Sequence, residues 1–374
     1  MNFKMKVMEI IQNKNWSELA AKYDWVADMH NVQQDNIHHA EGDVAIHTQM
    51  VLHELINLKE YQDLDVIAKE IIWTAALLHD VEKRSTTIME ENGSISSPNH
   101  AKKGALTARQ ILFTEFNISF NSREQIVGLV RFHGLPLWLM HKPNPFKTLL
   151  DASFKVNTKW LCILAKADML GRICNDKNEM LERIDFFEAY CKEQNCFGIA
   201  RKFETNAAKF NYFYKENVSA NYVPYEDCCC EVILMSGLPG MGKDTYIQKH
   251  DKDYPIISLD EIRRRNKLKP EDTSANGWVA QQAKEQAKIY LRAKQNFMWN
   301  ATNITSQMRA QLIDLFASYG AYIKIVYIEK PYKIWQNQNT KREEMVPKAV
   351  LQKMLYKLEV PTLTEAHEVA FLVD

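Results

Sequence analysis

Histidine and aspartate are the residue types most able to do chemistry in the first half of the chain. Nine of the eleven histidines lie before residue 142. His79 and Asp80 are adjacent in LLHDVEK, at the end of an apolar stretch. Adjacent residues on a helix point about 100° apart, so a target that both reach must lie off the helix end or between them. A metal ion satisfies that geometry, and an imidazole nitrogen with a carboxylate oxygen suits manganese, iron, cobalt, nickel or zinc.

A second chemistry is indicated by the segment GLPGMGKDT. It almost fits the phosphate-binding loop pattern G-x-x-x-x-G-K-[ST], in which backbone amides surround phosphate groups and the lysine reaches the outer ones. We expect this loop to bind the triphosphate of a nucleotide. Its residues are Gly237, Leu238, Pro239, Gly240, Met241, Gly242, Lys243, Asp244 and Thr245.

The loop departs from the pattern directly after its lysine. A hydroxyl at this position normally ligates the magnesium that accompanies the nucleotide. Here the residue is Asp244, and a hydroxyl comes one position later, at Thr245. Because a carboxylate is itself a magnesium ligand, we expect Asp244 to hold the ion, at some cost in repulsion toward the triphosphate. On this hypothesis a serine at position 244 retains kinase activity and an alanine loses much of it.

Downstream residues suit the acceptor side of a phosphoryl transfer. SLDEIRR offers Asp260, which is placed to take a proton from an acceptor hydroxyl, and Arg263, which can hold a phosphate of that acceptor. An alternative role for Asp260 is to cap the helix that SLDE opens. The segment QNQNTKREEMVP resembles the arginine-bearing lid of small kinases, in which Arg342 neutralises charge on the transferred phosphoryl group.

The elements that must position these residues differ between the two halves of the chain. In EYQDLDVIAKEIIWTAALLHD, SREQIVGLVRFHG and NTKWLCILAKADMLGR, apolar residues recur every three to four positions, which predicts helices. We expect an all-α domain over residues 1–215. After a linker at residues 216–229, the apolar runs CCCEVILMSG, YPIISLD, NFMWNATN and AYIKIVYIE alternate with helical stretches. This alternation predicts a parallel α/β sheet over residues 230–374.

The order of a histidine, an HD dipeptide and a distant aspartate resembles the HD phosphohydrolase superfamily. That resemblance implies a helical bundle that holds one or two divalent transition metals, with Asp80 bridging two ions. The implied ligands are His47, His79, Asp80, His100, His133 and Asp168. Any one of these histidines alone has an ordinary explanation as a core or surface residue. A metal centre of this kind activates water and orients a phosphoryl oxygen, so the expected reaction is phosphoester hydrolysis.

Two cationic residues fit the same resemblance. Lys83 and Arg172 match the HD-x-x-K and D-x-x-x-R patterns of related enzymes. Lys83 can reach a phosphate or assist the leaving group. Arg172, four residues after Asp168 and on the same helix face, can clamp a phosphate. Each also has an ordinary explanation as a surface charge.

In the second half, GLPGMGKDT, SLDEIR, NATN and the lid segment resemble the 5′-hydroxyl polynucleotide kinase group in order and spacing. The resemblance implies that Asp260 is the general base, that Arg263 contacts the acceptor phosphate and that Arg342 is the lid arginine. Gln338 stands where that group often has a second lid arginine, a departure that predicts reduced nucleotide affinity.

The two motif sets together resemble the bifunctional HD-domain polynucleotide kinase and phosphatase enzymes of bacterial nucleic-acid end repair. This implies that the HD domain opens a 2′,3′-cyclic phosphate and removes the resulting terminal phosphate. The kinase would phosphorylate a 5′-hydroxyl with Mg²⁺ and ATP or another nucleoside triphosphate. The implied partners are RNA or DNA ends and an RNA ligase that acts downstream. Two alternatives stay open: both sites act on free nucleotides or nucleosides, or the chain is a nucleotide-gated RNA-binding module without turnover.

Composition limits the remaining choices. The 374 residues carry 47 Lys and Arg against 47 Asp and Glu, so a polynucleotide needs a local basic patch, for which EIRRRNKLK is a candidate. The seven cysteines include no C-x-x-C pair and are typical of small apolar residues in a reducing compartment. Because neither a membrane-spanning run nor a signal peptide is evident, we expect a cytoplasmic protein, as a monomer or an oligomer.

Overall fold

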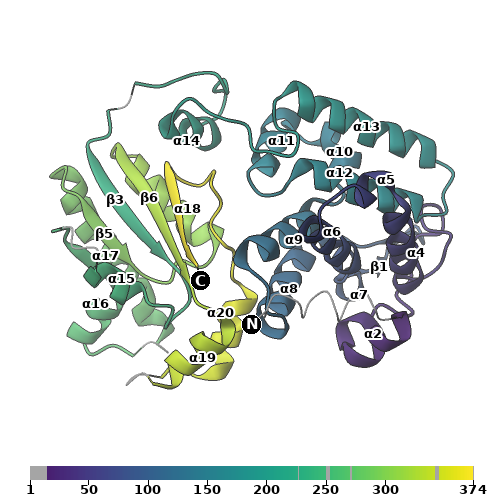
Figure 1. Cartoon of the computed structure of the whole chain (residues 1–374). Coiled ribbons are helices and arrows are strands. Elements are labelled where there is room, and N and C mark those ends of the chain that lie inside the picture. The colour runs from purple at the N-terminus through teal and green to yellow at the C-terminus, as the bar shows by residue number, and fades with distance from the viewer. Residues whose placement is uncertain (1–14, 226, 250–252, 270–271, 342–344, 374) are drawn as a thin grey trace. The chain divides into compact units, whose positions relative to one another are not determined.

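The computed structural model describes residues 15–225, 227–249, 253–269, 272–341 and 345–373. The chain forms two compact units, residues 1–201 and residues 202–374 (Figure 1). The first is helical and the second is built on a parallel sheet, which confirms the expected fold class.

Helices make up most of the described part of the first unit, coloured purple to teal in Figure 1. They are α2 (Trp16–Lys22), α3 (Asp24–Ala27), α4 (Val44–Asn57), α5 (Lys59–Gln62), α6 (Val66–Leu78), α7 (Lys83–Thr86), α8 (His100–Glu115), α9 (Phe120–Phe132), α10 (Leu135–Trp138), the 3-10 turn η2 (Leu139–His141), α11 (Pro145–Ser153), α12 (Thr158–Leu170) and α13 (Lys177–Glu193). Helix α12 packs on α4 and α6, and α9 packs on α6 and α8. The contact between α4 and α12 brings together segments that lie more than a hundred residues apart.

A small hairpin departs from the all-α expectation. Strands β1 (Ile88–Met89) and β2 (Ile95–Ser96) pair antiparallel. Asn92 and Gly93 make the turn between them, with Gly93 at a φ of 83° and the Asn92 side chain accepting from the backbone of Ser94 at 3.0 Å. An Asn-Gly pair is a strong hairpin signal, but the strands are too short to show alternation in the sequence.

Helix starts in this unit follow the capping chemistry of short polar side chains. Asp43 caps α4, Asp65 caps α6 and Asn157 caps α12, each by accepting a hydrogen bond from a backbone amide of the first turn. Helices α6 and α9 each end immediately before a histidine, His79 and His133 respectively. The helix ends therefore place two of the expected metal ligands.

The second unit contains a five-stranded sheet in the order β4-β5-β3-β6-β7, with every neighbouring pair parallel. Its strands are β3 (Cys230–Ser236), β4 (Ile256–Ser258), β5 (Phe297–Asn300), β6 (Ala321–Glu329) and β7 (Glu368–Val373). Its helices are α14 (Asn206–Tyr214), α15 (Lys243–Lys249), α16 (Leu259–Arg265), α17 (Thr273–Arg292), α18 (Ser306–Ala317), α19 (Tyr332–Thr340) and α20 (Lys348–Tyr356). The four apolar runs of the sequence correspond to β3 to β6. Strand β7 was not expected, because it lies at the edge of the sheet and its burial is mixed.

One face of the sheet carries a continuous apolar core. Alternate residues of the central strands, such as Val232 and Leu234 of β3, meet Ala287 of α17 and Phe316 of α18. Because side chains alternate across a strand, these β3 residues share a face. Strand β3 is the middle strand and the chain crosses from one side of it to the other, so its carboxyl end is the position where parallel sheets bind ligands.

The boundary between the units lies earlier than expected. The units divide between Arg201 and Lys202, whereas the sequence suggested residue 215. Helix α14 is helical as predicted, but it belongs to the second unit. Phe210 lies in the sheet core and its ring centroid is 4.1 Å from that of His367. Periodicity shows that α14 has an apolar face but not what that face packs against, so a change from helices to strands was a poor guide to the boundary.

Candidate functional site

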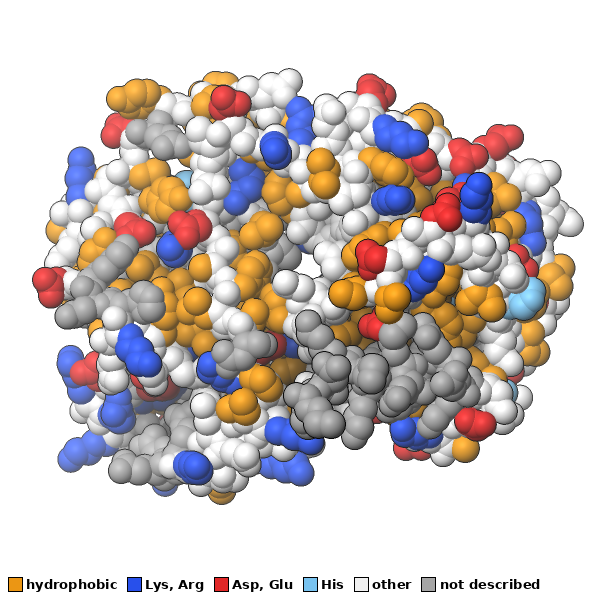
Figure 2. Space-filling model, in the orientation of Figure 1, with side chains coloured by type: hydrophobic (Ala, Val, Ile, Leu, Met, Phe, Trp, Pro, Cys, Tyr) orange, Lys and Arg blue, Asp and Glu red, His pale blue; other side chains and the backbone are white. Residues whose placement is uncertain are grey.

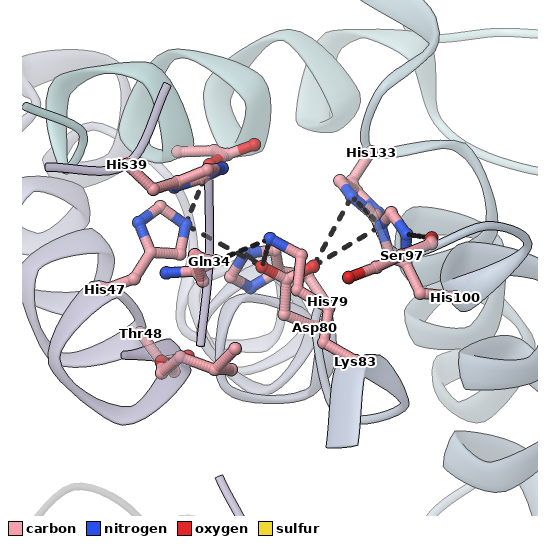
Figure 3. A network of polar contacts seen from close by, with 12 residues as sticks. Gln34, His39, His47, Thr48, His79, Asp80, Lys83, Ser97, His100 and His133 are labelled. Carbon is pink, nitrogen blue, oxygen red and sulfur yellow. Dashed lines mark hydrogen bonds and ion pairs between the residues drawn. The ribbon is translucent and has the colours of Figure 1, made fainter. Parts of the chain in front are cut away.

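Asp80 lies at the centre of a buried group of imidazoles in the first unit (Figure 3). Its Oδ2 lies 3.2 Å from Nε2 of His79 and 3.8 Å from Nε2 of His47. Its Oδ1 lies 3.4 Å from Nε2 of His100 and 3.9 Å from Nε2 of His133. Figure 3 shows His47 on one side of Asp80, and His100 and His133 on the other. The two oxygens of one carboxylate thus face two different groups of histidines.

Backbone carbonyls orient three of these rings. In His79, His100 and His133, Nδ1 lies 2.7, 2.7 and 2.9 Å from the carbonyl oxygen three residues earlier in the chain. For His79 and His133 that carbonyl is in the last turn of a helix, where carbonyls lack helical partners. An Nδ1–H that donates to a carbonyl leaves Nε2 unprotonated and turned toward Asp80, the form in which imidazole binds a metal.

A carboxylate lies beside the fourth ring. Nδ1 of His47 lies 2.8 Å from Oε1 of Glu41 without hydrogen-bond geometry, and Nδ1 of His39 lies 2.8 Å from the same oxygen and forms a hydrogen bond with it. The other oxygen of Glu41 accepts from the backbone amide of Ile173 at 2.8 Å. The Glu41 side chain is only 1% exposed, so it acts within the core. The sequence analysis did not select Glu41 and His39. The feature that could have indicated them is their position a few residues before His47.

Asp168 reaches the same centre from α12. Its Oδ1 lies 3.1 Å from Nε2 of His47. Arg172, one helical turn later, donates from Nε to Oδ1 at 3.0 Å and from Nη2 to Oδ2 at 2.6 Å, which makes the pair bidentate. In this structure the guanidinium of Arg172 therefore binds Asp168. The sequence suggested instead that this guanidinium binds a phosphate.

Lys83 opens α7 and is buried at the edge of the centre. Its Nζ lies 2.8 Å from Oδ2 of Asp80 and donates to Oε1 of Gln34 at 2.7 Å. The ammonium is therefore in the centre, as expected, and is not a surface charge. Gln34 was not anticipated, because it lies in a loop with no motif of its own.

The charges of the centre suit a metal. Burial raises the pKa of Asp80 and Asp168, but cationic neighbours outweigh burial and hold both pKa values well below the usual range. The neighbour with the largest effect is His79 for Asp80 and Arg172 for Asp168. Burial lowers the pKa of His133 to about 3, and it also lowers the pKa of His100. Burial lowers the pKa of His79 as well, but the Asp80 carboxylate outweighs this and raises it overall. The raised pKa means that the His79 ring tends to hold a second proton, which a bound cation would displace.

Several buried polar atoms of the centre have no hydrogen-bond partner. They include Nε2 of His47, Nε2 of His79 and Oδ1 of Asp80. Such atoms are costly when nothing satisfies them. Donor atoms of His47, His79 and Asp80 lie within 4.8 Å of one another, as do those of Asp80, His100 and His133. These two groups of possible ligand atoms share Asp80, and each could hold a metal ion.

The phosphate loop of the second unit connects β3 to α15, the context in which the motif binds phosphate. Gly237, Gly240 and Gly242 adopt φ values of 147°, 77° and 99°, which other residues rarely adopt. At Gly237 a Cβ atom would lie 2.5 Å from the carbonyl oxygen of Ile328, so the loop passes too close to β6 for a side chain. Lys243 donates to the carbonyls of Gly237 and Leu238 at 2.9 Å each.

The NATN segment that follows β5 braces the start of this loop. The side-chain amide of Asn303 donates to the carbonyl of Met235 at 2.7 Å. The backbone amide of Gly237 donates to the carbonyl of Thr302 at 2.9 Å. One turn of the phosphate loop is therefore fixed by a segment more than sixty residues later in the chain.

Asp260 is in the first turn of α16 and its side chain is 80% exposed. It does not cap the helix: Ser258 does so, by accepting from the backbone amide of Glu261 at 3.3 Å. The residue that caps α16 is therefore Ser258 and not Asp260. Asp260 is instead paired with Arg263, whose Nη1 lies 2.6 Å from its Oδ1. The carboxylate is accessible to an acceptor.

Arg263 has a second partner and basic neighbours. Its Nε donates to Oδ1 of Asn276 at 3.1 Å, which fixes the guanidinium between α16 and α17. The other cations of this segment are exposed: Arg264, Arg265, Lys267 and Lys269. Figure 2 shows Lys and Arg side chains gathering over the part of this unit that carries α16 and α19. Arg342, the expected lid arginine, lies outside the described residues.

None of the helices that the structure describes is long and apolar enough to cross a lipid bilayer.

A family match locates the similarity to known proteins in the second unit. Residues 232–361 match the AAA_33 family, described as an AAA domain. Over 150 residues the chain is 27% identical to heterogeneous nuclear ribonucleoprotein U-like protein 2 of Mus musculus, and it is equally similar to the Homo sapiens protein. Each match covers 35% of this chain and 20% of the relative, so the chain spans about a fifth of the length of these curated relatives.

Solved structures show only remote likeness. A candidate kinase from Chloroflexus aurantiacus is 15% identical with a TM-score of 0.34, over 39% of this chain and 86% of that one. A sugar kinase from Janibacter sp. HTCC2649 is 16% identical with a TM-score of 0.30, over 38% and 85%. The family match and the loop together show that the second unit is a P-loop domain, which implies a nucleotide with magnesium.

Proposed function

We propose that the chain heals both ends of a broken nucleic acid. The first unit hydrolyses a 2′,3′-cyclic phosphate and then removes the terminal phosphate that results. The second unit phosphorylates a 5′-hydroxyl with a nucleoside triphosphate. The observation that carries this proposal is Asp80, whose two oxygens face two groups of metal-binding atoms in the same chain as a P-loop kinase-like domain.

In the first unit the side chains divide the work of phosphoester hydrolysis. His47, His79, Asp80 and Asp168 would hold one divalent metal, and Asp80 with His100 and His133 a second. The metals supply Lewis acidity to a phosphoryl oxygen and to the attacking water. Lys83 lies beside Asp80, where its ammonium can contact the phosphate and protonate the leaving oxygen. Arg172 acts through Asp168, which it keeps ionised and oriented.

In the second unit the loop and α16 hold donor and acceptor. The backbone amides of the loop contact the triphosphate, and Lys243 exchanges its carbonyl partners for the outer phosphates. Asp260 takes the proton of the acceptor hydroxyl. Arg263, fixed by Asn276, holds the phosphate that follows the acceptor nucleoside.

A polynucleotide acceptor is supported by three features. Hydrolase and kinase chemistry on one chain matches the two ends of a break. Exposed cations adjoin Asp260 on α16 and just after it. The curated relatives are named as ribonucleoproteins, which favours RNA over DNA. The products suit a ligase, which would act next. The cysteine pattern supports a reducing, cytoplasmic setting.

One incubation tests the proposal. The substrate is an oligoribonucleotide with a 5′-hydroxyl and a 2′,3′-cyclic phosphate, supplied with ATP, Mg²⁺ and Mn²⁺, and mass spectrometry reads both ends. We expect a 5′-phosphate and a free 3′ end, and slower 5′-phosphorylation of a DNA oligonucleotide of the same sequence with a 5′-hydroxyl. Ends that stay unchanged with every metal would refute the proposal. Mononucleotides that react as fast as the oligonucleotide would favour free nucleotides as substrates.

A further inference from the structure

Two positions of the second unit differ from the usual magnesium-binding pattern of P-loop sites. In the usual P-loop site the residue after the lysine offers a hydroxyl, and a neighbouring strand ends in an aspartate. In this chain the residue after the lysine is Asp244, and the strand β5 ends in Asn300. The carboxylate is on the loop and the neutral side chain is on the strand.

The sheet brings the two residues into contact. Strand β5 pairs directly with β3, with Leu234 opposite Trp299, so the next residue of β5 lies beside the start of the loop. The amide nitrogen of Asn300 donates to Oδ1 of Asp244 at 2.7 Å. Asp244 is exposed and Asn300 is half-buried. The exposed carboxylate keeps its second oxygen for an ion, and the strand fixes its direction.

We propose that Asp244 is the protein ligand of the kinase magnesium and that Asn300 positions it. The carboxylate is then on the loop, where the usual site has a hydroxyl, and the neutral side chain is on the strand, where the usual site has a carboxylate. The donor set suits the ion, because magnesium prefers oxygen ligands and a carboxylate in particular. The net charge of the pair is the same as in the usual arrangement. This proposal rests on nucleotide binding by the second unit and not on the identity of the acceptor.

Charge repulsion explains why Asn300 accompanies Asp244. Two carboxylates at the separation seen between these side chains repel, and one of them would be favoured to take up a proton. An amide instead donates a hydrogen bond to the loop carboxylate. The exchange therefore makes a specific prediction: each residue is suited to the other, and changing either one alone damages the site.

Variants that reverse the exchange test it. The readout is the dissociation constant of a fluorescent ATP analogue, measured with Mg²⁺ and with EDTA, so neither an acceptor nor turnover is needed. We expect Asp244→Ser and Asn300→Asp each to reduce the magnesium-dependent gain in affinity by about tenfold or more. We expect the double variant Asp244→Ser/Asn300→Asp to recover it to within about threefold of the parent. This changes the expectation from sequence alone, in which serine at position 244 suffices.

Controls separate a lost ion from a damaged fold. Asp253→Ser removes another exposed carboxylate of the same unit and should leave the magnesium-dependent gain unchanged. Affinity in EDTA should be similar in all variants, because backbone amides and Lys243 are retained. The proposal is overturned if Asp244→Ser keeps the full gain, if the double variant is no better than the single ones, or if Thr245→Val alone removes it. Because no acceptor is present, these outcomes are independent of whether RNA ends are the substrate.

Discussion

The two candidate sites are built in opposite ways. The centre around Asp80 consists of buried side chains, with His47 and Asp168 both 0% exposed, and its groups are fixed by partners such as Glu41 and Arg172. The kinase-like site consists of a backbone loop and exposed side chains, with Asp260 80% exposed. A metal centre needs several donors fixed in advance, whereas a kinase site must admit two substrates. The difference teaches that the first site depends on core packing and the second on loop shape.

The sharpest way to break this comparison is to inactivate each site alone. Lys243→Ala should lower kinase activity by about 10³-fold and leave hydrolysis unchanged, because the lysine belongs to the phosphate loop of the second unit and has no role in the first. Asp80→Asn should lower hydrolysis at least as much and leave the kinase unchanged, because it removes the carboxylate that both metal groups share. Separate assays of the two ends measure this. A parallel fall of both activities in either variant would mean that the sites are not independent.

The exposed acceptor side can be tested with a substitution that leaves the fold intact. Asp260→Asn should reduce kinase turnover by about 10²-fold with little change in ATP affinity, because only the proton acceptor is lost. The neighbouring Glu261→Gln is the matched control and should keep its turnover. Single-turnover kinetics separates the chemical step from binding. Unchanged turnover in Asp260→Asn would remove its role as general base.

Metal should stabilise one unit and not the other. Manganese at about 100 times its dissociation constant should raise the free energy of unfolding of the first unit by about 2.7 kcal/mol relative to chelator. The physical reason is that the ion satisfies buried atoms that lack partners, such as Nε2 of His79. Hydrogen exchange resolved by peptides measures each unit separately. Equal protection with manganese and with chelator would contradict a metal centre in the first unit.

The smallest expected effect concerns a residue that touches no metal. Glu41→Gln should weaken metal binding by about 10- to 100-fold, because the Glu41 carboxylate lies 2.8 Å from Nδ1 of His47 and its negative charge favours a proton on that nitrogen. Nitrogen NMR of the imidazole should show a mixture of tautomers in this variant. Glu60→Gln, which alters an exposed pair with Lys166, is the control. Unaltered metal affinity and an unaltered His47 spectrum would reduce Glu41 to a structural role.

The sequence predicted well what local pattern and order determine. Helical periodicity, strand runs and the phosphate loop were all visible, and the fold class is confirmed. The resemblance selected six side chains between residues 47 and 168, and the structure brings them together. Their role as metal ligands stays a prediction, as does that of Lys83. Arg172 shows what residue spacing leaves undetermined. The spacing places Arg172 beside Asp168 on one helix face, but it does not predict that the two side chains pair with each other.

The rest depends on contacts between distant segments. The pairing of Asn300 with Asp244 follows from the sheet order, in which β5 and not β4 is the neighbour of β3. Glu41 meets His39, His47 and the backbone of Ile173 only when the helices pack. Neither relation has a signature in spacing, because tertiary structure alone determines which polar groups are buried together. A sequence pattern marks residues that do chemistry more readily than residues that hold them in place.

Asp80 has a consequence for the order in which metal ions load. Its single negative charge serves two neighbouring positions, one through each oxygen. If both positions take an ion, the first would neutralise that charge, and the second would meet a weaker attraction and also the repulsion of the first. Metal titration should therefore proceed in two steps, with a one-ion form stable over a range of concentrations. The supply of metal around the protein would then decide which of two differently charged active centres meets the substrate.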